Sequence, residues 1–184
     1  MPRKPKYDVL VLRTCNADMT SRNGFKWPKR GPVSCNDWDP APRCGNGLHG
    51  LAWGIGNAEL MDWSRDAVWL VVGVKSSEMV DVGGKVKFPR GYVMYRGNRA
   101  DAVLKIQKTS PDPKLCAGST ATAGDAGTAT AGDAGTATAG NRGTATAGDA
   151  GTATAGYAGT ATAGYAGTAT AGDAGTATAG YAGT

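Results

Sequence analysis

The sequence has no long hydrophobic run: no segment approaches the ~20 consecutive apolar residues that a membrane-spanning helix requires. The N-terminal segment 1–14 also lacks the apolar stretch and the small-residue cleavage site of a secretory signal peptide. From these two absences we expect a protein without a membrane partner and with a cytoplasmic location.

Large side chains and positive charge are scarce in the last part of the chain. Residues 115–184 contain no Trp, Phe or His, and their single Arg and four Asp give a net charge of −3. Residues 1–114 contain all five Trp and carry a net charge of +8. We therefore predict a basic head domain at 1–114 and a second domain at 115–184. The basic residues of the head are scattered, so charge does not indicate nucleic-acid binding.

Closely spaced pairs of metal ligands are absent. A Cys3His zinc site can be drawn from Cys15, Cys35, Cys44 and His49, but structural zinc sites usually supply ligands in pairs such as C-x2-C. We therefore predict no metal and keep these four residues only as candidates. One alternative makes Cys15 and Cys44 small buried residues and His49 a hydrogen-bonded strand histidine. The other is a catalytic Cys/His pair, for which no third residue is recognisable.

Complete phosphate-binding motifs are absent as well. Neither Gly54-Ile55-Gly56 nor Gly83-Gly84 extends to a G-x-G-x-x-G or G-x4-G-K pattern, and we expect no cofactor. The four Cys could form two disulfides. Without a secretion signal, we expect reduced thiols.

The head domain contains short segments rich in β-branched and aromatic residues, which together with two helical segments predict an α+β fold. Gly83-Gly84 predicts a two-residue hairpin turn, because such turns need positive φ at both central positions. Asn57 and Asn98 are expected N-caps of helices that begin NAELMDWSRD and NRADAVLKI. The Gly-, Pro- and Asn-rich segment 16–47 is expected to be a long loop. The expected strands are 7–13, 68–74, 78–82, 85–88 and 92–96.

The second domain repeats the octapeptide A-G-x-A-G-T-A-T. Gly recurs every eight residues from 124 to 180 and from 127 to 183, and Thr follows the same period. Flexible low-complexity sequence has no need to keep two Gly and two Thr in phase. The T-A-T unit is a strand signal, and the adjoining Gly can supply corners. We therefore predict an all-β parallel β-solenoid over 115–184, with 115–122 as a degenerate first copy.

The simplest coil contains two octads, or 16 residues, because one octad is too short to close once the corners are subtracted. The variable position x supports this choice. Coils of 24 residues would stack Asp125, Asp149 and Asp173 directly, with like charges ~4.8 Å apart. Coils of 16 residues instead place Tyr165 over Tyr181.

The small Ala between the two Thr fits a thin interior, which leaves the Thr side chains in two outward ranks ~7 Å apart along each strand. The reverse arrangement, with Thr hydroxyls bonded to one another inside the stack, is the alternative. With Thr outward, the predicted binding surface comprises Thr128, Thr130, Thr136, Thr138, Thr144, Thr146, Thr152, Thr154, Thr160, Thr162, Thr168, Thr170, Thr176 and Thr178.

Four motifs of the head resemble an uncharacterised domain of phage, prophage and bacterial proteins. They are NGFKWP (23–28), CGNGLHG (44–50), WLVVGV (69–74) and VDVGGKVKFPRGYVMYRG (80–97). The resemblance covers most of residues 7–106, and members of that family often carry an octapeptide-repeat tail. It implies no established activity. A phage origin would make a virion-associated or surface location the alternative to the cytoplasm.

The A-G-Y, Gly/Ser-Thr and T-x-T elements of the repeats resemble the central domain of bacterial ice nucleation proteins. This resemblance implies flat T-x-T arrays that order water, and association through Tyr columns, here Tyr157, Tyr165 and Tyr181. The array is much shorter here, so potent nucleation is not expected. Exposed strand edges at a solenoid end also predict self-association into a homo-oligomer or filament.

These features predict a non-enzymatic structural or binding protein in which a β-solenoid with Thr ladders carries a small head domain. The alternative is a nucleotide-directed enzyme or ligand-binding head on an oligomerising repeat scaffold. It rests on a loose similarity to ADP-ribosyltransferases, with Arg13 at the end of an early strand and Glu78 near a later one.

Overall fold

The computed structural model describes residues 7–21, 23–112 and 116–184. The chain divides into two compact units, Met1–Pro111 and Asp112–Thr184. The predicted domain boundary between residues 114 and 115 lies outside the described residues. Within the described ranges, no helix is long and apolar enough to cross a membrane.

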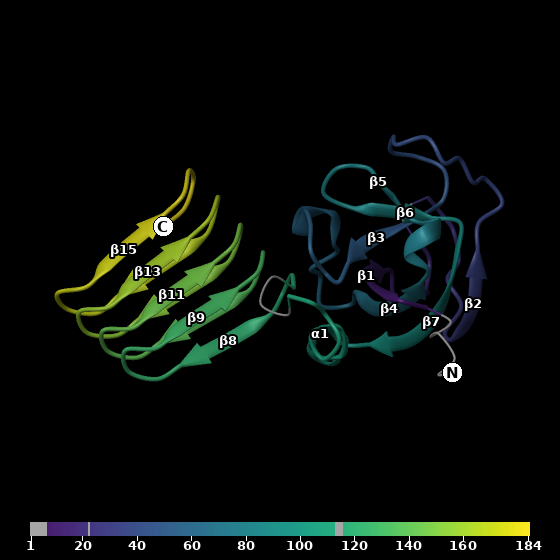
Figure 1. The fold of residues 1–184 in the computed structure, drawn as a ribbon. Coiled ribbons are helices and arrows are strands. Elements are labelled where there is room, and N and C mark those ends of the chain that lie inside the picture. Colours follow the sequence, from purple (N-terminus) through teal and green to yellow (C-terminus); the bar gives the residue numbers. More distant parts are fainter. Residues whose placement is uncertain (1–6, 22, 113–115) are drawn as a thin grey trace. The chain divides into compact units, whose positions relative to one another are not determined.

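The N-terminal unit is built on one seven-stranded sheet in which neighbouring strands are antiparallel (Figure 1). The strand order is β2-β7-β4-β1-β3-β6-β5. With one α-helix, this architecture confirms the predicted α+β class. The strands are β1 (Val9–Cys15), β2 (Gly31–Ser34), β3 (Leu48–Ala52), β4 (Val68–Val74), β5 (Val80–Asp81), β6 (Val86–Phe88) and β7 (Arg90–Gly97).

Each of the five expected strand segments overlaps an observed strand, but β2 and β3 are absent from the expected set. β2 lies inside the segment 16–47, for which a loop is expected. Its sequence Gly-Pro-Val-Ser has no apolar alternation, and Pro32 suits a strand at the sheet edge. β3 carries His49, as the strand-histidine alternative requires, and Cys15 is buried, but the burial that this alternative gave Cys44 is wrong because Cys44 is exposed.

The glycine pair forms the predicted hairpin turn between β5 and β6. Gly83 and Gly84 have φ values of 79° and 70°. The N–H of Val82 donates to the carbonyl of Lys85 at 3.0 Å. Positive φ at both central positions is typical of a type I′ turn. Glycine suits both positions because residues with a Cβ are strained at positive φ.

Both predicted N-cap residues cap a helical turn, but only one begins an α-helix. Asn98 caps α1 (Arg99–Gln107) through its side-chain oxygen, as predicted. Asn57 caps only a 3-10 turn, η1 (Ala58–Leu60), because the backbone becomes extended at the buried Met61. The helix expected over NAELMDWSRD is therefore wrong beyond its first turn. A second 3-10 turn, η2 (Ser76–Glu78), precedes β5.

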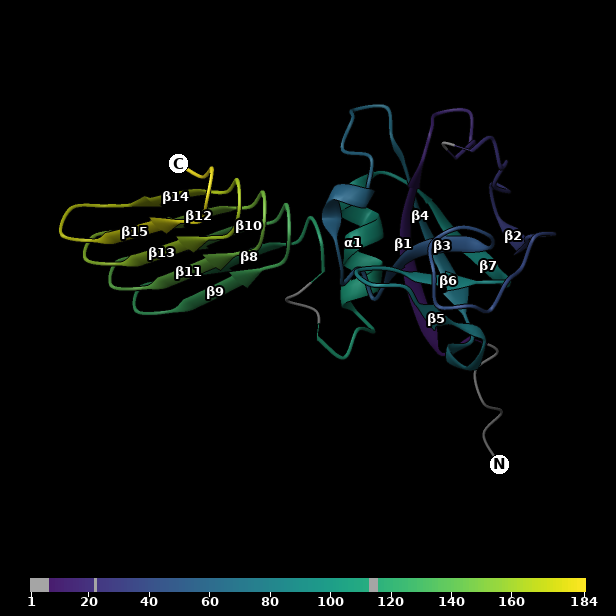
Figure 2. The ribbon, with the colours of Figure 1, turned by 90° about the horizontal axis from the view of Figure 1, so that it is seen from above.

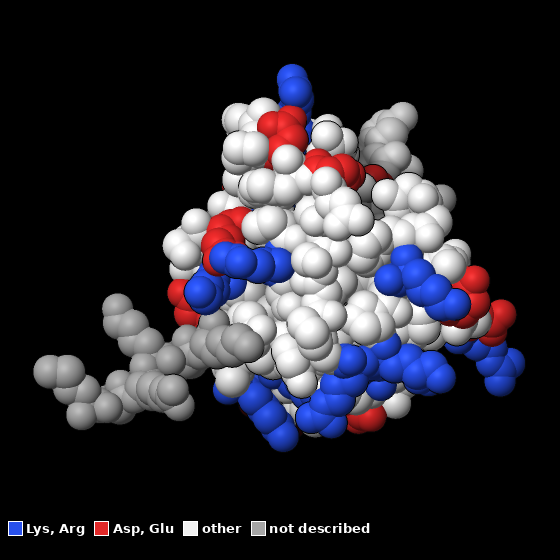
Figure 3. Space-filling view, turned by 90° about the vertical axis from the view of Figure 1, so that its right-hand side faces the viewer, with Lys and Arg blue, Asp and Glu red and all other residues white. Residues whose placement is uncertain are grey.

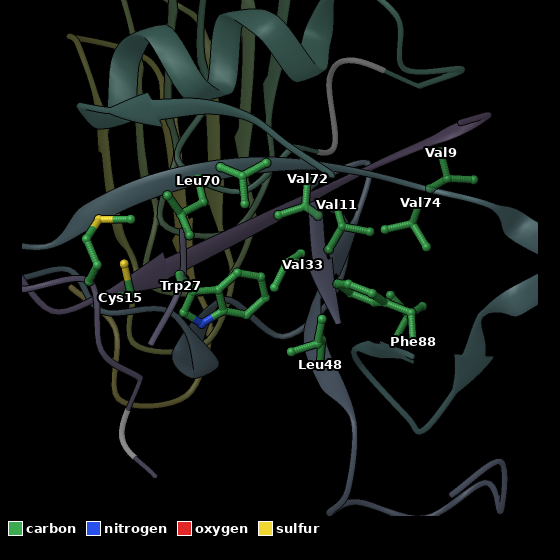
Figure 4. Close-up of a cluster of buried hydrophobic side chains, with 13 residues drawn as sticks. Val9, Val11, Cys15, Trp27, Val33, Leu48, Leu70, Val72, Val74 and Phe88 are labelled. Carbon is green, nitrogen blue, oxygen red and sulfur yellow. The ribbon is translucent and has the colours of Figure 1, made fainter. Parts of the chain in front are cut away.

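The main hydrophobic core of this unit receives side chains from strands as far apart in the sheet as β2 and β6 (Figure 4). Val33 of β2 and Phe88 of β6 share one cluster with Val11 and Val72 of the central strands. Strands so far apart in the sheet order can share a cluster only because the sheet is strongly curled. The helix α1 packs against β1, β4 and β7, on the other side of β4 from this cluster.

The C-terminal unit is a parallel β-solenoid made of two sheets (Figure 2). The strand orders are β14-β12-β10-β8 and β15-β13-β11-β9. Paired residues are one coil apart, as where Thr136 lies opposite Thr152. This register confirms the 16-residue coil. The strands are β8 (Thr120–Ala123), β9 (Thr128–Ala131), β10 (Thr136–Ala139), β11 (Thr144–Ala147), β12 (Thr152–Ala155), β13 (Thr160–Ala163), β14 (Thr168–Ala171) and β15 (Thr176–Ala179).

Alanine fills the space between the two solenoid sheets. Ala137 and Ala145, from opposite sheets, are fully buried, and the interior cluster contains alanine only. The second Ala of each T-A-T-A strand points inward as well, so that every interior strand contributes two methyl groups. The Thr side chains point outward, and the arrangement with Thr inside is therefore wrong.

The corners place alanine, not glycine, in the left-handed backbone region. In every repeat after the degenerate first copy, the residue after x has φ between 48° and 59°, and it is Ala in all but one, where it is Arg142. The corner glycines are needed for a different reason. A Cβ on Gly143 would lie 2.8 Å from the Cβ of Ala139, closer than two carbon atoms can pack. The periodic Gly thus reflects close packing at the corners.

Two Ala-to-Gly substitutions three residues apart should have opposite effects. Ala150 adopts a left-handed backbone conformation, which is strained for a residue with a Cβ but not for Gly. Ala150→Gly should therefore raise the free energy of unfolding by up to about 1 kcal/mol. Ala153→Gly removes a buried methyl group and should lower it by about 1–2 kcal/mol. Denaturant titration followed by circular dichroism measures both. Equal destabilisation by the two substitutions would contradict backbone strain at position 150.

Candidate functional site

The predicted Thr surface forms two separate ladders, one on each solenoid sheet. None of its residues is buried, and the first Thr of every strand is exposed. The second Thr is exposed at Thr138, Thr170 and Thr178 and half-buried at the other predicted positions. One ladder comprises Thr136, Thr138, Thr152, Thr154, Thr168 and Thr170, together with Thr120 and Thr122 of β8, which lie outside the predicted set. The other comprises Thr128, Thr130, Thr144, Thr146, Thr160, Thr162, Thr176 and Thr178.

Each ladder is a regular grid of hydroxyl and methyl groups. Every Thr lies opposite the equivalent Thr of the next coil, as Thr144 does opposite Thr160. Strand geometry sets the spacing at ~4.8 Å between coils and ~7 Å along a strand. The strands contain only Thr and Ala, so no charged side chain interrupts the grid. Such a surface can hold water molecules at repeated positions.

The variable residue x joins successive coils through side-chain hydrogen bonds at the corners. The N–H of Asn141 donates to Asp125 Oδ1 at 2.9 Å, and the N–H of Tyr157 donates to Asn141 Oδ1 at 3.0 Å. The same contact recurs in the other column, through Asp133 and Asp149. Sequence reasoning missed this role. The sequence does contain a signal for this role, because x is often Asp or Asn. The side chains of these residues readily form hydrogen bonds with nearby backbone groups.

The tyrosines at x lie on the outside of the solenoid. Tyr165 and Tyr181 stack in neighbouring coils, with ring centroids 6.0 Å apart and an interplanar angle of 19°. Tyr157 lies in the other column, between Asn141 and Asp173. All three rings are exposed, Tyr181 most of all at 84%.

Three of the four candidate zinc ligands, Cys15, Cys44 and His49, line one hollow of the N-terminal unit, but they do not group around a common point. Cys35 Sγ donates to the carbonyl of Pro89 at 3.3 Å, and Cys44 Sγ accepts from Lys85 Nζ at 3.0 Å. Cys15 is buried. All three are free thiols. In the parts of the chain that the structure describes, no three His, Cys, Asp or Glu side chains are grouped so that they could hold a metal ion.

The thiols differ in acidity because their surroundings differ. The hydrogen bond from Lys85 lowers the pKa of the exposed Cys44 thiol, whereas burial raises the pKa of the Cys15 thiol. Cys44 and His49 both line one hollow, but Cys44 is bonded to Lys85. The hydrogen-bond partner of Cys44 is therefore Lys85 and not a histidine base.

His49 is held in its neutral form. It lies on β3, and its Nε2 is buried without a hydrogen-bond partner. Burial is the largest cause that lowers its pKa, to about 4, and the charges of Lys85, Arg13 and Lys87 act in the same direction. The imidazole is therefore uncharged at neutral pH.

Arg13 and Glu78 do not form a common site. Arg13 lies near the end of β1, where Cys15 pairs with Val68, whereas Glu78 follows the opposite end of β4. Glu78 is bound by Arg90 at 2.7 Å. The arrangement that suggested an ADP-ribosyltransferase is thus not assembled in the structure.

Positive charge on the N-terminal unit is divided into separate groups. On the face shown in Figure 3, Lys and Arg side chains form several clusters, and Asp or Glu side chains lie beside most of them. This face offers no single basic stripe of the kind that follows a nucleic-acid backbone.

The two units define the class of this protein: a curled antiparallel sheet with one α-helix, joined to a β-solenoid with Thr on its faces. The chain belongs to a family described as "Domain of unknown function (DUF7666)", whose model matches residues 9–105. The resemblance of the head to an uncharacterised domain is therefore confirmed.

The curated relatives are ice nucleation proteins. The chain is 40% identical over 105 residues, or 56% of its length, to one from Xanthomonas campestris pv. translucens, and 36% identical over 111 residues, or 59%, to one from Pseudomonas fluorescens. Such stretches are longer than the repeat segment 115–184, so they include part of the N-terminal unit. They span only 7% and 9% of those relatives. No solved structure matches the chain.

Acid should destabilise the N-terminal unit through its one histidine. Between pH 6.5 and about 4, His49 binds a proton in the unfolded chain but not in the folded protein. The free energy of unfolding should therefore fall as pH falls through this window and level off, for this group, below pH 4. His49→Gln should flatten the profile there, measured by denaturant titration at each pH. Parallel profiles for the parent and the variant would show that His49 is not buried as a neutral group.

Proposed function

We propose that the β-solenoid orders water at an ice surface through its Thr ladders. The observation that carries this proposal is the uncharged grid of outward Thr, in register from coil to coil, on a chain similar to ice nucleation proteins. This function requires no catalysed reaction, so we propose a non-enzymatic repeat protein with a head domain. The expected cytoplasmic location stays a prediction.

The coils within residues 116–184 set how strong the effect of this segment by itself can be. Each solenoid sheet has four strands, which at ~4.8 Å per strand gives a ladder of roughly 14 Å between its first and last strands. So small an area can bind a growing ice surface but organises few water molecules. We therefore expect slowed ice recrystallisation and little change in freezing temperature.

Lysine substitutions on each Thr ladder test this function. Thr136→Lys with Thr152→Lys, or Thr144→Lys with Thr160→Lys, puts two charges on one ladder and should remove most of the inhibition of ice recrystallisation by that ladder. Ala134→Lys with Ala150→Lys adds the same charge at corners, where Arg142 shows that a long basic side chain fits, and should leave the activity unchanged. Circular dichroism checks that each variant is folded. If both Thr variants inhibit like the parent, the ladders are not the ice surface.

We further propose that the stacked tyrosines form a contact between copies of the protein. Tyr165 and Tyr181 present adjacent rings on the outside of the solenoid, with large exposed fractions of 49% and 84%. Exposed aromatic side chains are common in the centres of protein interfaces. Association of this kind would place several Thr ladders side by side and enlarge the ordered area.

Sedimentation velocity over a range of concentrations tests the tyrosine contact. The parent should show a sedimentation coefficient that rises with concentration, and Tyr165→Ser with Tyr181→Ser should abolish the rise. Tyr157→Ser is the matched control, because Tyr157 has no stacked tyrosine among the described coils, and it should still associate. A parent that stays monomeric at high concentration would rule the contact out.

A further inference from the structure

The N-terminal unit contains two adjoining hollows that share one polar wall. Their volumes are about 310 Å³ and 410 Å³. Arg13, Ser21, Asn23 and His49 line both hollows. The larger hollow is also lined by Phe25, Trp27 and Leu48, so polar groups face an apolar surface across it. Volumes of this size accommodate a small organic molecule.

Arg13 presents a positive charge in this wall without an acidic partner. Its guanidinium carbon lies 4.5 Å from the centre of the Trp27 ring, and one terminal nitrogen donates to the carbonyl of His49 at 2.6 Å. Burial lowers the Arg13 pKa to about 10, which still leaves the group charged at neutral pH. No carboxylate of the described residues forms an ion pair with it. A largely desolvated charge without a counter-charge is costly, so its retention calls for a compensating anion.

Each hollow is also lined by one acidic residue, whose carboxylate accepts from a backbone N–H. Asp37 Oδ1 accepts from the N–H of Gly47 at 3.1 Å, in the larger hollow. Asp62 Oδ1 accepts from the N–H of Ser64 at 2.9 Å, in the smaller one. Each of these carboxylates thus accepts from a backbone N–H, and neither forms an ion pair with Arg13.

Three residues that line the larger hollow, Arg13, Trp27 and His49, each have a buried side-chain nitrogen without a hydrogen-bond partner. These nitrogens are Arg13 Nε, Trp27 Nε1 and His49 Nε2, and in the described part of the chain no other buried side-chain nitrogen or oxygen is unpaired. Trp27 itself is only 2% exposed. Its indole nitrogen lies on the edge of the ring that faces away from Leu70 (Figure 4). Buried polar groups are normally paired, so three unpaired nitrogens on residues that line one hollow require an explanation.

We infer that this hollow binds a small molecule that carries an oxyanion, either a carboxylate or a phosphate. The Nε–H of Arg13 and the Nε1–H of Trp27 donate to the oxyanion, and the guanidinium supplies the compensating charge. His49, which is neutral, bonds to a polar group of the ligand through Nε2. Phe25 and Leu48 contact its apolar part. This site is separate from the Thr ladders and serves binding in the head domain.

Titration of the whole ¹⁵N-labelled protein with inorganic phosphate and with acetate, at constant ionic strength in sodium chloride, tests the site. The indole N–H resonance of Trp27 should shift saturably, and the anion that binds more tightly identifies the ligand class. The indole N–H of Trp63, which already donates to the carbonyl of Ala58 at 2.9 Å, should stay in place. If neither anion shifts the Trp27 resonance at tens of millimolar, the inference is wrong.

A matched pair of variants assigns the charge. Arg13→Gln should weaken anion binding by about tenfold or more, because a hydrogen bond to a charged group is lost. Arg65→Gln, at an exposed position outside both hollows, should bind like the parent. Equal weakening by the two substitutions would indicate a general effect of net charge and would overturn the site. Since Arg13 also stacks on Trp27, the titration of the parent stands as a test even if Arg13→Gln is unstable.

Discussion

The space between the two solenoid sheets admits methyl groups and little else, and the rest of the C-terminal unit follows from this constraint. A buried methyl group contributes only about 0.8 kcal/mol, whereas ordering the backbone of one residue costs about 1–2 kcal/mol. Alanine burial within one coil therefore cannot stabilise that coil. The hydrogen bonds between coils must contribute the difference, including those that Asp125 and Asn141 accept at the corners. A coil is thus stable only when it is stacked on a neighbour, which makes the register of 16 residues as important as the composition.

The two units use polar groups in opposite ways. In the solenoid, hydroxyl groups are displayed outward on flat sheets, and among its described residues no buried side-chain polar atom lacks a partner. In the N-terminal unit, a curled sheet encloses aromatic side chains, and three residues that line one hollow carry unpaired nitrogens. The solenoid therefore suits recognition of an extended, repetitive surface, whereas the head suits recognition of one small molecule.

The sequence predicted most of the solenoid because its repeats report the register directly. The eight-residue period of Gly and Thr, together with the repulsion between Asp side chains that longer coils would stack, predicted the coil of 16 residues that the structure shows. The small size of Ala predicted that Ala fills the interior. The head was less predictable. The strands with β-branched runs were found, but β2 depends on pairing with the distant β7, and Asn57 caps only one turn because Met61 is needed in the core. The larger hollow, which Arg13 lines, could not be predicted from the sequence, because tertiary folding brings its residues together from distant parts of the chain.

The equivalence of the two octads in each coil has a consequence for how such a chain can evolve. Gain or loss of one octad by recombination within the gene would exchange the two sheets, yet it would keep every Ala inside and every Thr outside. The neighbours at the corners would change, because residues now paired across 16 positions, such as Tyr165 and Tyr181, would fall into different columns. Tyr165 and Tyr181 stay in the same column only if the number of octads inserted between them is even. A change in array length of eight residues therefore keeps the Ala interior and the Thr faces. Only a change of sixteen residues also keeps the pairs of corner residues.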